Sequence, residues 1–194
     1  MMHKTSSIGQ LFGVVLLVLT LFAPCVHADE YAAVNGLLRD GRLSEALVSA
    51  DQYLEKNPRD PQMRFLRGLI QQDSGDLEAA IVTYTSLMQD YPELPEPYNN
   101  VAVIYAGQAQ FTKARDALEM ATRNSRSYAT AHENLGDVYA RLANEAYTQA
   151  VQMDAGNKTL APKLALIRQL INFPASSRKA PFPGPITPAP APRN

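Results

Sequence analysis

The pattern of apolar and polar residues divides the chain into four segments. The run from Leu11 to Ala23 is almost wholly apolar. A long middle segment alternates helix-forming stretches with Gly or Pro breaks, which predicts paired α-helices joined by turns. Residues 160–173 repeat Leu and Ile at helical spacing and predict a final amphipathic helix. From Pro174 to the end there are seven prolines and no acidic residue. That composition predicts an extended tail without a core.

The middle segment predicts four helix–turn–helix units. The first three cover residues 29–59, 60–91 and 92–124. Gly41 and Gly75 end the first helix of their units, since glycine adopts the left-handed conformation that a helix C-terminus often needs. The third unit has Ala109 in the corresponding turn, and Pro58 and Pro92 end the second helices of the first two units.

The fourth unit lacks a turn. Its small residue Ala143 follows Ala114 by 29 residues, whereas the preceding steps are 34 residues long. The missing residues fall where the two helices of the unit would meet, and no Gly or Pro remains there. We therefore expect one long helix from Ala129 to about Met153 that caps the array, with residues 160–173 as its covering helix.

A period of 34 residues runs through the units. The recurring positions form three series of similar residues: Ala46, Ala80 and Ala114; Gly68, Ala102 and Gly136; and Tyr105 and Tyr139. We expect the small residues to let the two helices of a unit approach closely. Large residues at Leu37, Tyr105 and Tyr139 are expected to fill the space between units.

These units resemble tetratricopeptide repeats. That family carries the pattern W-x2-L-G-x2-Y followed by A-x3-F, A and P. The fourth unit has Leu135, Gly136 and Tyr139 in this spacing, with His132 in the place of the Trp. The second has Gly68, Ala80, Tyr84 and Pro92. The resemblance implies an all-α solenoid, a right-handed superhelix of helix–turn–helix units with a C-terminal capping helix, over residues 29–173.

The resemblance also implies a concave groove, lined by the first helix of each unit, that accepts a peptide or a partner helix. Phe65 and Leu69 would be its apolar anchors, and the amides of Asn100 and Asn134 would bind an extended backbone. The alternative is that these amides only satisfy local groups. Some members of the family hold the C-terminal carboxylate of a partner with lysines of the groove. Phe65 and Asn99 occupy the positions where such lysines would be needed, which argues against a carboxylate-binding groove. The groove set is Phe65, Leu69, Gln72, Asn99, Asn100, Val103, Asn134, Asp137 and Arg141, with Gln62, Asp73, Glu96 and Glu133 beside it.

Composition narrows the function further. Acidic and basic residues are interspersed and the formal net charge is −1, which argues against a nucleic-acid partner. After Ala28 the only histidine is His132, and the single cysteine is Cys25. One histidine without a cysteine cannot make a Cys–His or Ser–His–Asp site or a histidine-rich metal site. We therefore expect a scaffold without a cofactor. The rival class, an envelope enzyme, would need a catalytic cluster.

The N-terminal segment has the layout of a secretory signal peptide. Lys4 precedes the apolar run, and Val26-His27-Ala28 places small or modest residues before a cut at Asp29. This predicts a signal peptide over residues 1–28, a periplasmic or secreted mature form that does not span a membrane, and envelope proteins or peptides as partners. The alternatives are an uncleaved anchor and a membrane-tethered envelope or pilus assembly factor lipidated at Cys25. The Pro-rich tail at 174–194 is predicted to be disordered. A role as a spacer or as a ligand for a proline-reading domain stays open.

Overall fold

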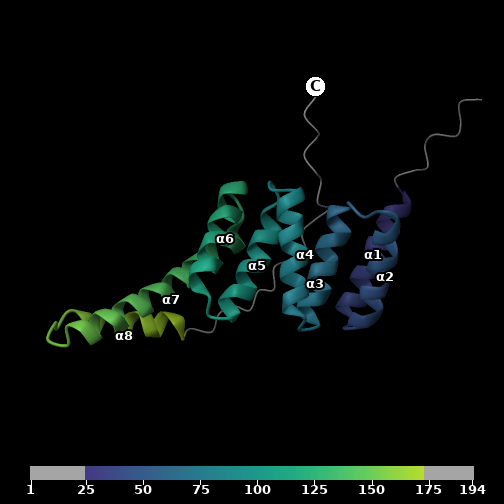
Figure 1. Ribbon diagram of the computed structural model, residues 1–194. Helices are drawn as coiled ribbons and strands as arrows, with labels where there is room; N and C mark the ends of the chain where they lie inside the picture. Colours follow the sequence, from purple (N-terminus) through teal and green to yellow (C-terminus); the bar gives the residue numbers. More distant parts are fainter. Residues whose placement is uncertain (1–24, 173–194) are drawn as a thin grey trace, which may run out of the picture.

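The computed structural model describes residues 25–172, and every regular element among them is a helix (Figure 1). Most of the predicted signal peptide and the whole Pro-rich tail lie outside the described residues. The helices are α1 (Cys25–Arg39), α2 (Leu43–Lys56), α3 (Pro61–Asp73), α4 (Leu77–Asp90), α5 (Pro95–Gly107), α6 (Phe111–Asn124), α7 (Ala129–Met153) and α8 (Leu160–Ile171).

Helices α1 to α6 form three hairpins that pack side by side (Figure 1). Each inter-helix turn has one residue with a positive φ: 73° at Gly41, 81° at Gly75 and 57° at Ala109. The third turn repeats the hydrogen bonds of the first two, because the Gln110 amide donates to the Tyr105 carbonyl at 2.8 Å. Ala109 therefore adopts the glycine conformation in spite of its Cβ, which costs about 1–2 kcal/mol.

The link between the first two hairpins is organised by Asp60. Its Oδ1 accepts a hydrogen bond from the Met63 amide at 2.7 Å and so caps the N-terminus of α3. Its Oδ2 accepts a hydrogen bond from the Tyr31 hydroxyl of α1 at 2.6 Å. Burial and this hydrogen bond raise the pKa of Tyr31 well above its usual value. The Tyr31 hydroxyl therefore stays a donor at neutral pH, and one carboxylate ties α1 to the start of α3.

The recurring small residues lie in the core, as the 34-residue period predicts. Ala46, Ala80, Ala102 and Ala114 are fully buried, each in one of the three apolar clusters that run along the array. Deep burial of a small side chain is what close packing of neighbouring helices needs, because a larger side chain there forces the backbones apart.

Gly68 and Tyr84 make the tightest contact between α3 and α4. A Cβ built on Gly68 would lie 2.5 Å from Cε1 of the Tyr84 ring. The ring also packs against Phe65, with centroids 5.7 Å apart. Tyr84 is fully buried, so the missing side chain at Gly68 is the space that the ring occupies.

Two landmark residues of the fourth unit, Gly136 and Tyr139, are not buried in this way. Nothing lies within 4 Å of a Cβ built on Gly136. Tyr139 is 47% exposed. The expectation that Gly136 brings two helices together and that Tyr139 fills an inter-unit space is therefore wrong. The reason is that α7 continues without folding back, so no second helix covers these residues.

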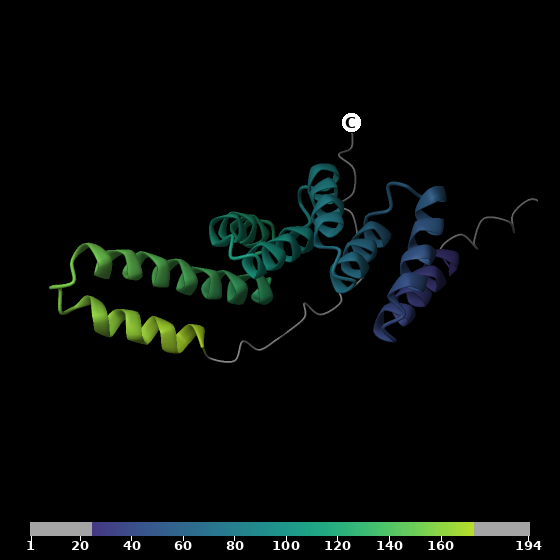
Figure 2. The ribbon, with the colours of Figure 1, turned by 60° about the horizontal axis from the view of Figure 1, so that its bottom comes forward.

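Helix α7 runs unbroken from Ala129 to Met153, as the missing turn predicts. Its C-terminal half leaves the array and pairs with α8 in an antiparallel hairpin (Figures 1 and 2). Leu164 is the buried residue of α8. The predicted C-terminal helix thus packs on the extension of α7, beyond the three hairpins.

The contrast between the two glycines gives a matched test of the packing. Gly68→Ala should lower the free energy of unfolding by about 1–3 kcal/mol, because the new methyl group overlaps the Tyr84 ring. Gly136→Ala should raise it by about 0.5–1 kcal/mol through helix propensity alone. Urea unfolding measures both changes. If Gly68→Ala were as stabilising as Gly136→Ala, the described contact between α3 and α4 would be wrong.

Candidate functional site

The first predicted anchor of the concave groove belongs to the core. Phe65 is only 2% exposed and packs with Tyr84, Leu87, Val101 and Ile104. This corrects the prediction that Phe65 anchors a partner. The α4 and α5 helices cover its ring, so a ligand cannot reach it without opening the array. Leu69 is half-buried and packs against both neighbouring apolar clusters.

The predicted amide contacts are used inside the protein. Asn99 is 1% exposed and Asn100 is 4% exposed. Asn134 Nδ2 donates to Asn99 Oδ1 at 2.9 Å, and Asn99 Nδ2 donates to Asn100 Oδ1 at 3.2 Å. Asn100 Nδ2 then donates to the Tyr84 hydroxyl at 3.2 Å, which donates to Gln72 Oε1 at 3.3 Å. We call these five residues the amide–tyrosine network.

The network agrees with the alternative that these amides satisfy local groups. It links α7, α5, α4 and α3, and the buried amides satisfy one another rather than a ligand. Burial raises the pKa of Tyr84 well above its usual value, so its hydroxyl stays protonated and can both accept and donate. The prediction that Asn99 and Asn100 face a groove is therefore wrong.

Of the nine predicted residues only Val103, Asp137 and Arg141 are exposed. The Arg141 guanidinium lies over the Phe111 ring at 5.6 Å from its centroid. His132 is also exposed, and its Nε2 lies 3.2 Å from the Arg126 carbonyl oxygen.

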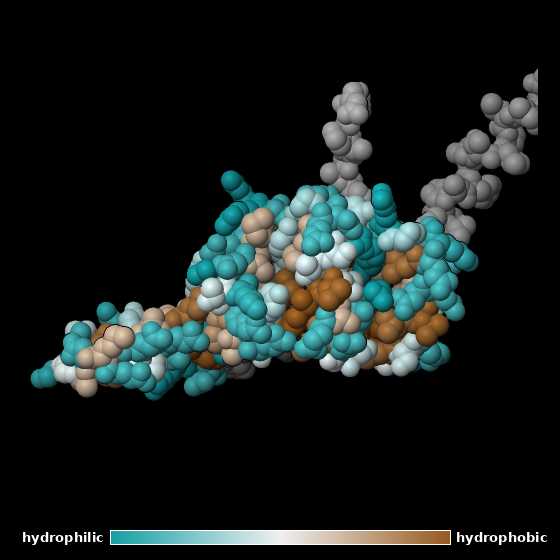
Figure 3. All heavy atoms as spheres, viewed as in Figure 1, coloured by the Kyte–Doolittle hydropathy of each residue, from teal (hydrophilic) through white to brown (hydrophobic). Residues whose placement is uncertain are grey.

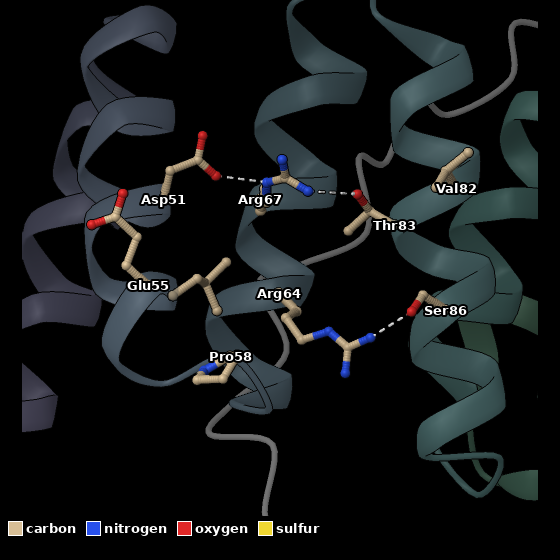
Figure 4. A pocket seen from close by; sticks show the side chains of 9 residues that line it. Asp51, Glu55, Pro58, Arg64, Arg67, Val82, Thr83 and Ser86 are labelled. Atoms are coloured by element: carbon tan, nitrogen blue, oxygen red, sulfur yellow. Dashed lines mark hydrogen bonds and ion pairs between the residues drawn. The ribbon is translucent and has the colours of Figure 1, made fainter.

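A groove opens elsewhere on the array, where α2 and α4 flank α3 (Figure 4). Its volume is about 590 Å³, within the range of ligand-binding clefts. Arg64 and Arg67 form the floor from α3 (Figure 4). We call it the arginine groove, and its lining is Asp51, Leu54, Glu55, Pro58, Arg64, Arg67, Val82, Thr83 and Ser86.

The walls hold both guanidinium groups in place. Arg67 Nε donates to Asp51 Oδ1 at 2.7 Å, and its Nη1 reaches Thr83 Oγ1 at 3.5 Å. The Thr83 hydroxyl in turn donates to Gln71 Oε1 at 2.7 Å, which fixes its position. One partner of Arg67 comes from α2 and the other from α4, so this arginine bridges two units.

Arg64 is held in a similar way and more deeply. Its Nη1 donates to Asp90 Oδ2 and its Nη2 to Ser86 Oγ, each at 2.7 Å. The Arg64 side chain is 12% exposed, whereas that of Arg67 is 38% exposed. A guanidinium has five N–H donors. Arg67 therefore keeps N–H donors beyond those used in its two contacts, on a side chain that is partly exposed.

Apolar surface lies beside these donors. Val82 is 69% exposed on the α4 wall, and Pro58 lies on the opposite side (Figure 4). Leu54 of α2 also lines the groove. Asp51 and Glu55 add carboxylates on the α2 side. An open groove that combines cationic donors, carboxylates and apolar surface suits a polypeptide segment, which presents all the matching groups.

Sequence reasoning missed this groove because the family register pointed to the other face of α3. By helical periodicity, Arg64 and Arg67 lie on the side of α3 opposite to Gln62, Leu69 and Asp73. The available signal was the pairing of two arginines three residues apart on α3 with two hydroxyl residues, Thr83 and Ser86, three residues apart on α4. Only the contact between the helices brings these pairs together.

The part of the chain that the structure describes has neither a candidate metal site nor a candidate membrane-spanning helix. Residues 25–172 contain no group of three or more His, Cys, Asp or Glu side chains placed to hold a metal ion. None of the helices in that range has the length and apolar character that crossing a bilayer needs.

Comparison with known proteins agrees with this architecture. The family model for the tetratricopeptide repeat matches residues 31–95. No curated protein matches the chain. Among solved structures, TTC0263, a thermophilic TPR protein of Thermus thermophilus, is 22% identical with a TM-score of 0.55, over 75% of this chain and 82% of that one.

Two further structures have the same fold. MamA of Desulfovibrio magneticus RS-1 is 19% identical with a TM-score of 0.55, over 74% of this chain and 85% of that one. Pseudomonas aeruginosa pilF is 17% identical with a TM-score of 0.56, over 74% of this chain and 68% of that one. Identities this low show a shared fold alone. Residues 31–95 thus match the tetratricopeptide-repeat family model, and the described helices have the fold of solved tetratricopeptide-repeat proteins.

Proposed function

We propose that this chain is a protein-interaction scaffold of the cell envelope and that a polypeptide segment of its partner lies in the arginine groove. The observation that carries the proposal is the pair of guanidinium groups, fixed by side chains of α2 and α4, beside the exposed apolar surface of Val82. Tetratricopeptide folds are in general those of non-enzymatic scaffolds that bind proteins, which supports the same class of function.

The lining of the arginine groove indicates which chemical groups the partner segment would carry. Its carboxylate or backbone carbonyl oxygens would accept hydrogen bonds from the free donors of Arg67. An apolar side chain would pack on Val82 and Pro58. A basic side chain would lie near Glu55, which is exposed on the α2 wall. The partner segment is therefore one with charges of both signs around an apolar residue.

Pre-organisation supports binding here rather than at the predicted concave positions. The two arginines are already held in one geometry by Asp51, Thr83, Asp90 and Ser86, so a ligand does not have to order them. The amides of the concave face, in contrast, would have to leave one another before they could contact a partner.

The envelope location rests on the N-terminal sequence. The apolar run from Leu11 to Ala23 and the Val26-His27-Ala28 site support export, with the mature chain in the periplasm or secreted. The alternative is a membrane-tethered envelope or pilus assembly factor in which Cys25 carries a lipid. In either form the partners would be envelope proteins or peptides.

Processing gives a direct test of the location. N-terminal sequencing and intact-mass measurement of the exported protein should return Asp29 as the first residue, because the cut follows Ala28. A lipid-modified Cys25 would support the tethered form instead. A chain that begins at Met1 would contradict export with cleavage.

Partner capture tests the groove. Arg67→Gln and Val82→Asn should each weaken capture of the envelope partner, since loss of a central anchor commonly lowers affinity roughly thirtyfold. Crosslinking of the exported protein in its own envelope, followed by mass spectrometry, identifies the partner. A titration with that purified partner then gives the affinities.

Matched variants on the other face serve as controls. Val103→Asn and Arg141→Gln change exposed residues of the predicted concave groove and should leave the affinity unchanged. Circular dichroism should show normal helicity for all four variants. The groove assignment is wrong if the concave-face variants weaken binding and Arg67→Gln and Val82→Asn do not.

A further inference from the structure

The projecting α7–α8 hairpin carries apolar side chains that no described residue covers. Met153 at the end of α7 is 86% exposed, and Leu166 and Leu170 of α8 are 66% and 57% exposed. Leu166 and Leu170 are four residues apart and so lie on one side of α8. Leu164, the buried residue of that helix, lies on a different side. Apolar and hydrophilic residues are mixed along the hairpin in the space-filling view (Figure 3).

The C-terminal part of the chain, which includes α8, is basic. All 19 acidic residues precede Ala155, together with 12 of the 18 basic ones, which gives a side-chain charge of −7. The 6 remaining basic residues follow Ala155 without any acidic residue, which gives +6. Three of them, Lys158, Lys163 and Arg168, lie among the described residues. Within this basic part, Lys163 lies three residues before Leu166 on the same side of α8, and Lys158 lies in the turn before the helix.

We propose that α8 binds the surface of an anionic lipid bilayer. Leu166 and Leu170 enter the boundary between headgroups and acyl chains, while Lys158 and Lys163 lie among the lipid phosphates. A helix with apolar residues on one side and basic residues next to them is the kind that lies in the plane of such an interface without crossing it. The Lys163 Nζ lies 5.8 Å from the centre of the Tyr147 ring of α7.

Shape and charge favour a bilayer over a protein partner on this face. The apolar strip is narrow and lies on the α7–α8 hairpin, which extends away from α1–α6 (Figure 2). An anionic surface attracts the basic end and repels the acidic array, which orients the molecule with the hairpin toward the lipid. The competing occupant is a second copy, whose acidic array could attract the basic end.

Vesicle binding tests the proposal. The protein is expressed from its complete coding sequence, so that every variant undergoes the same processing. It is then sedimented with one of two kinds of vesicle. Neutral vesicles contain phosphatidylcholine alone, and anionic vesicles contain phosphatidylcholine with about one third phosphatidylglycerol. We expect binding to the anionic vesicles only. The double change Leu166→Asn with Leu170→Asn should weaken it about tenfold or more, because less apolar surface is buried. Lys158→Gln with Lys163→Gln should weaken it as well, and high salt should weaken binding of the unaltered chain.

Val48→Asn is the matched control. Val48 is 57% exposed on α2, away from the hairpin, so this change should leave vesicle binding unaltered. Equal binding to neutral and anionic vesicles would overturn the proposal, and so would normal binding by the double leucine variant. A dimer in sedimentation velocity that the leucine changes abolish, without any vesicle binding, would assign the face to a second copy and also overturn it.

Discussion

The array depends on the contact between the Tyr84 ring and Gly68. The absent side chain at Gly68 makes room for a fully buried ring between α3 and α4, and that ring also packs on Phe65. Its hydroxyl then joins Gln72 to Asn100, so the same residue fills the apolar core and starts the polar contacts between units. A buried polar chain of this kind stabilises a structure only when every member has a partner. Asn99, Asn100 and Phe65, which the repeat register assigns to a concave groove, are therefore part of the internal packing.

The loss of one turn has consequences for the rest of the molecule. Because α7 does not fold back, it leaves Gly136 and Tyr139 uncovered and extends beyond the hairpins as a free arm. Helix α8 pairs with that arm. The array and the arm thus offer different surfaces. The arginine groove combines fixed donors and carboxylates on one side of α3, and the arm presents a basic helix with exposed leucines.

Much of the fold could be predicted from the sequence, because local rules decide it. The left-handed turns at Gly41 and Gly75, the buried Ala80 and the unbroken α7 follow from backbone conformation and side-chain size. The site could not be predicted in this way. The repeat register gives the helix face that Phe65 and Asn99 occupy, but it does not say whether a neighbouring helix covers that face. Similarly, the arginine groove exists only because α2 and α4 meet α3 on both sides, at distances that no spacing in the sequence gives.

Urea unfolding of Tyr84→Phe, compared with Tyr139→Phe, tests the central role of the amide–tyrosine network most directly. Both changes remove one hydroxyl, but the Tyr139 hydroxyl donates to Glu119 at an exposed site, where water can replace it. Tyr84→Phe should lower the free energy of unfolding by about 1–3 kcal/mol, because Gln72 and Asn100 lose a buried partner. Tyr139→Phe should change it by no more than about 0.5 kcal/mol. Equal, small changes for the two variants would contradict a central role for the network.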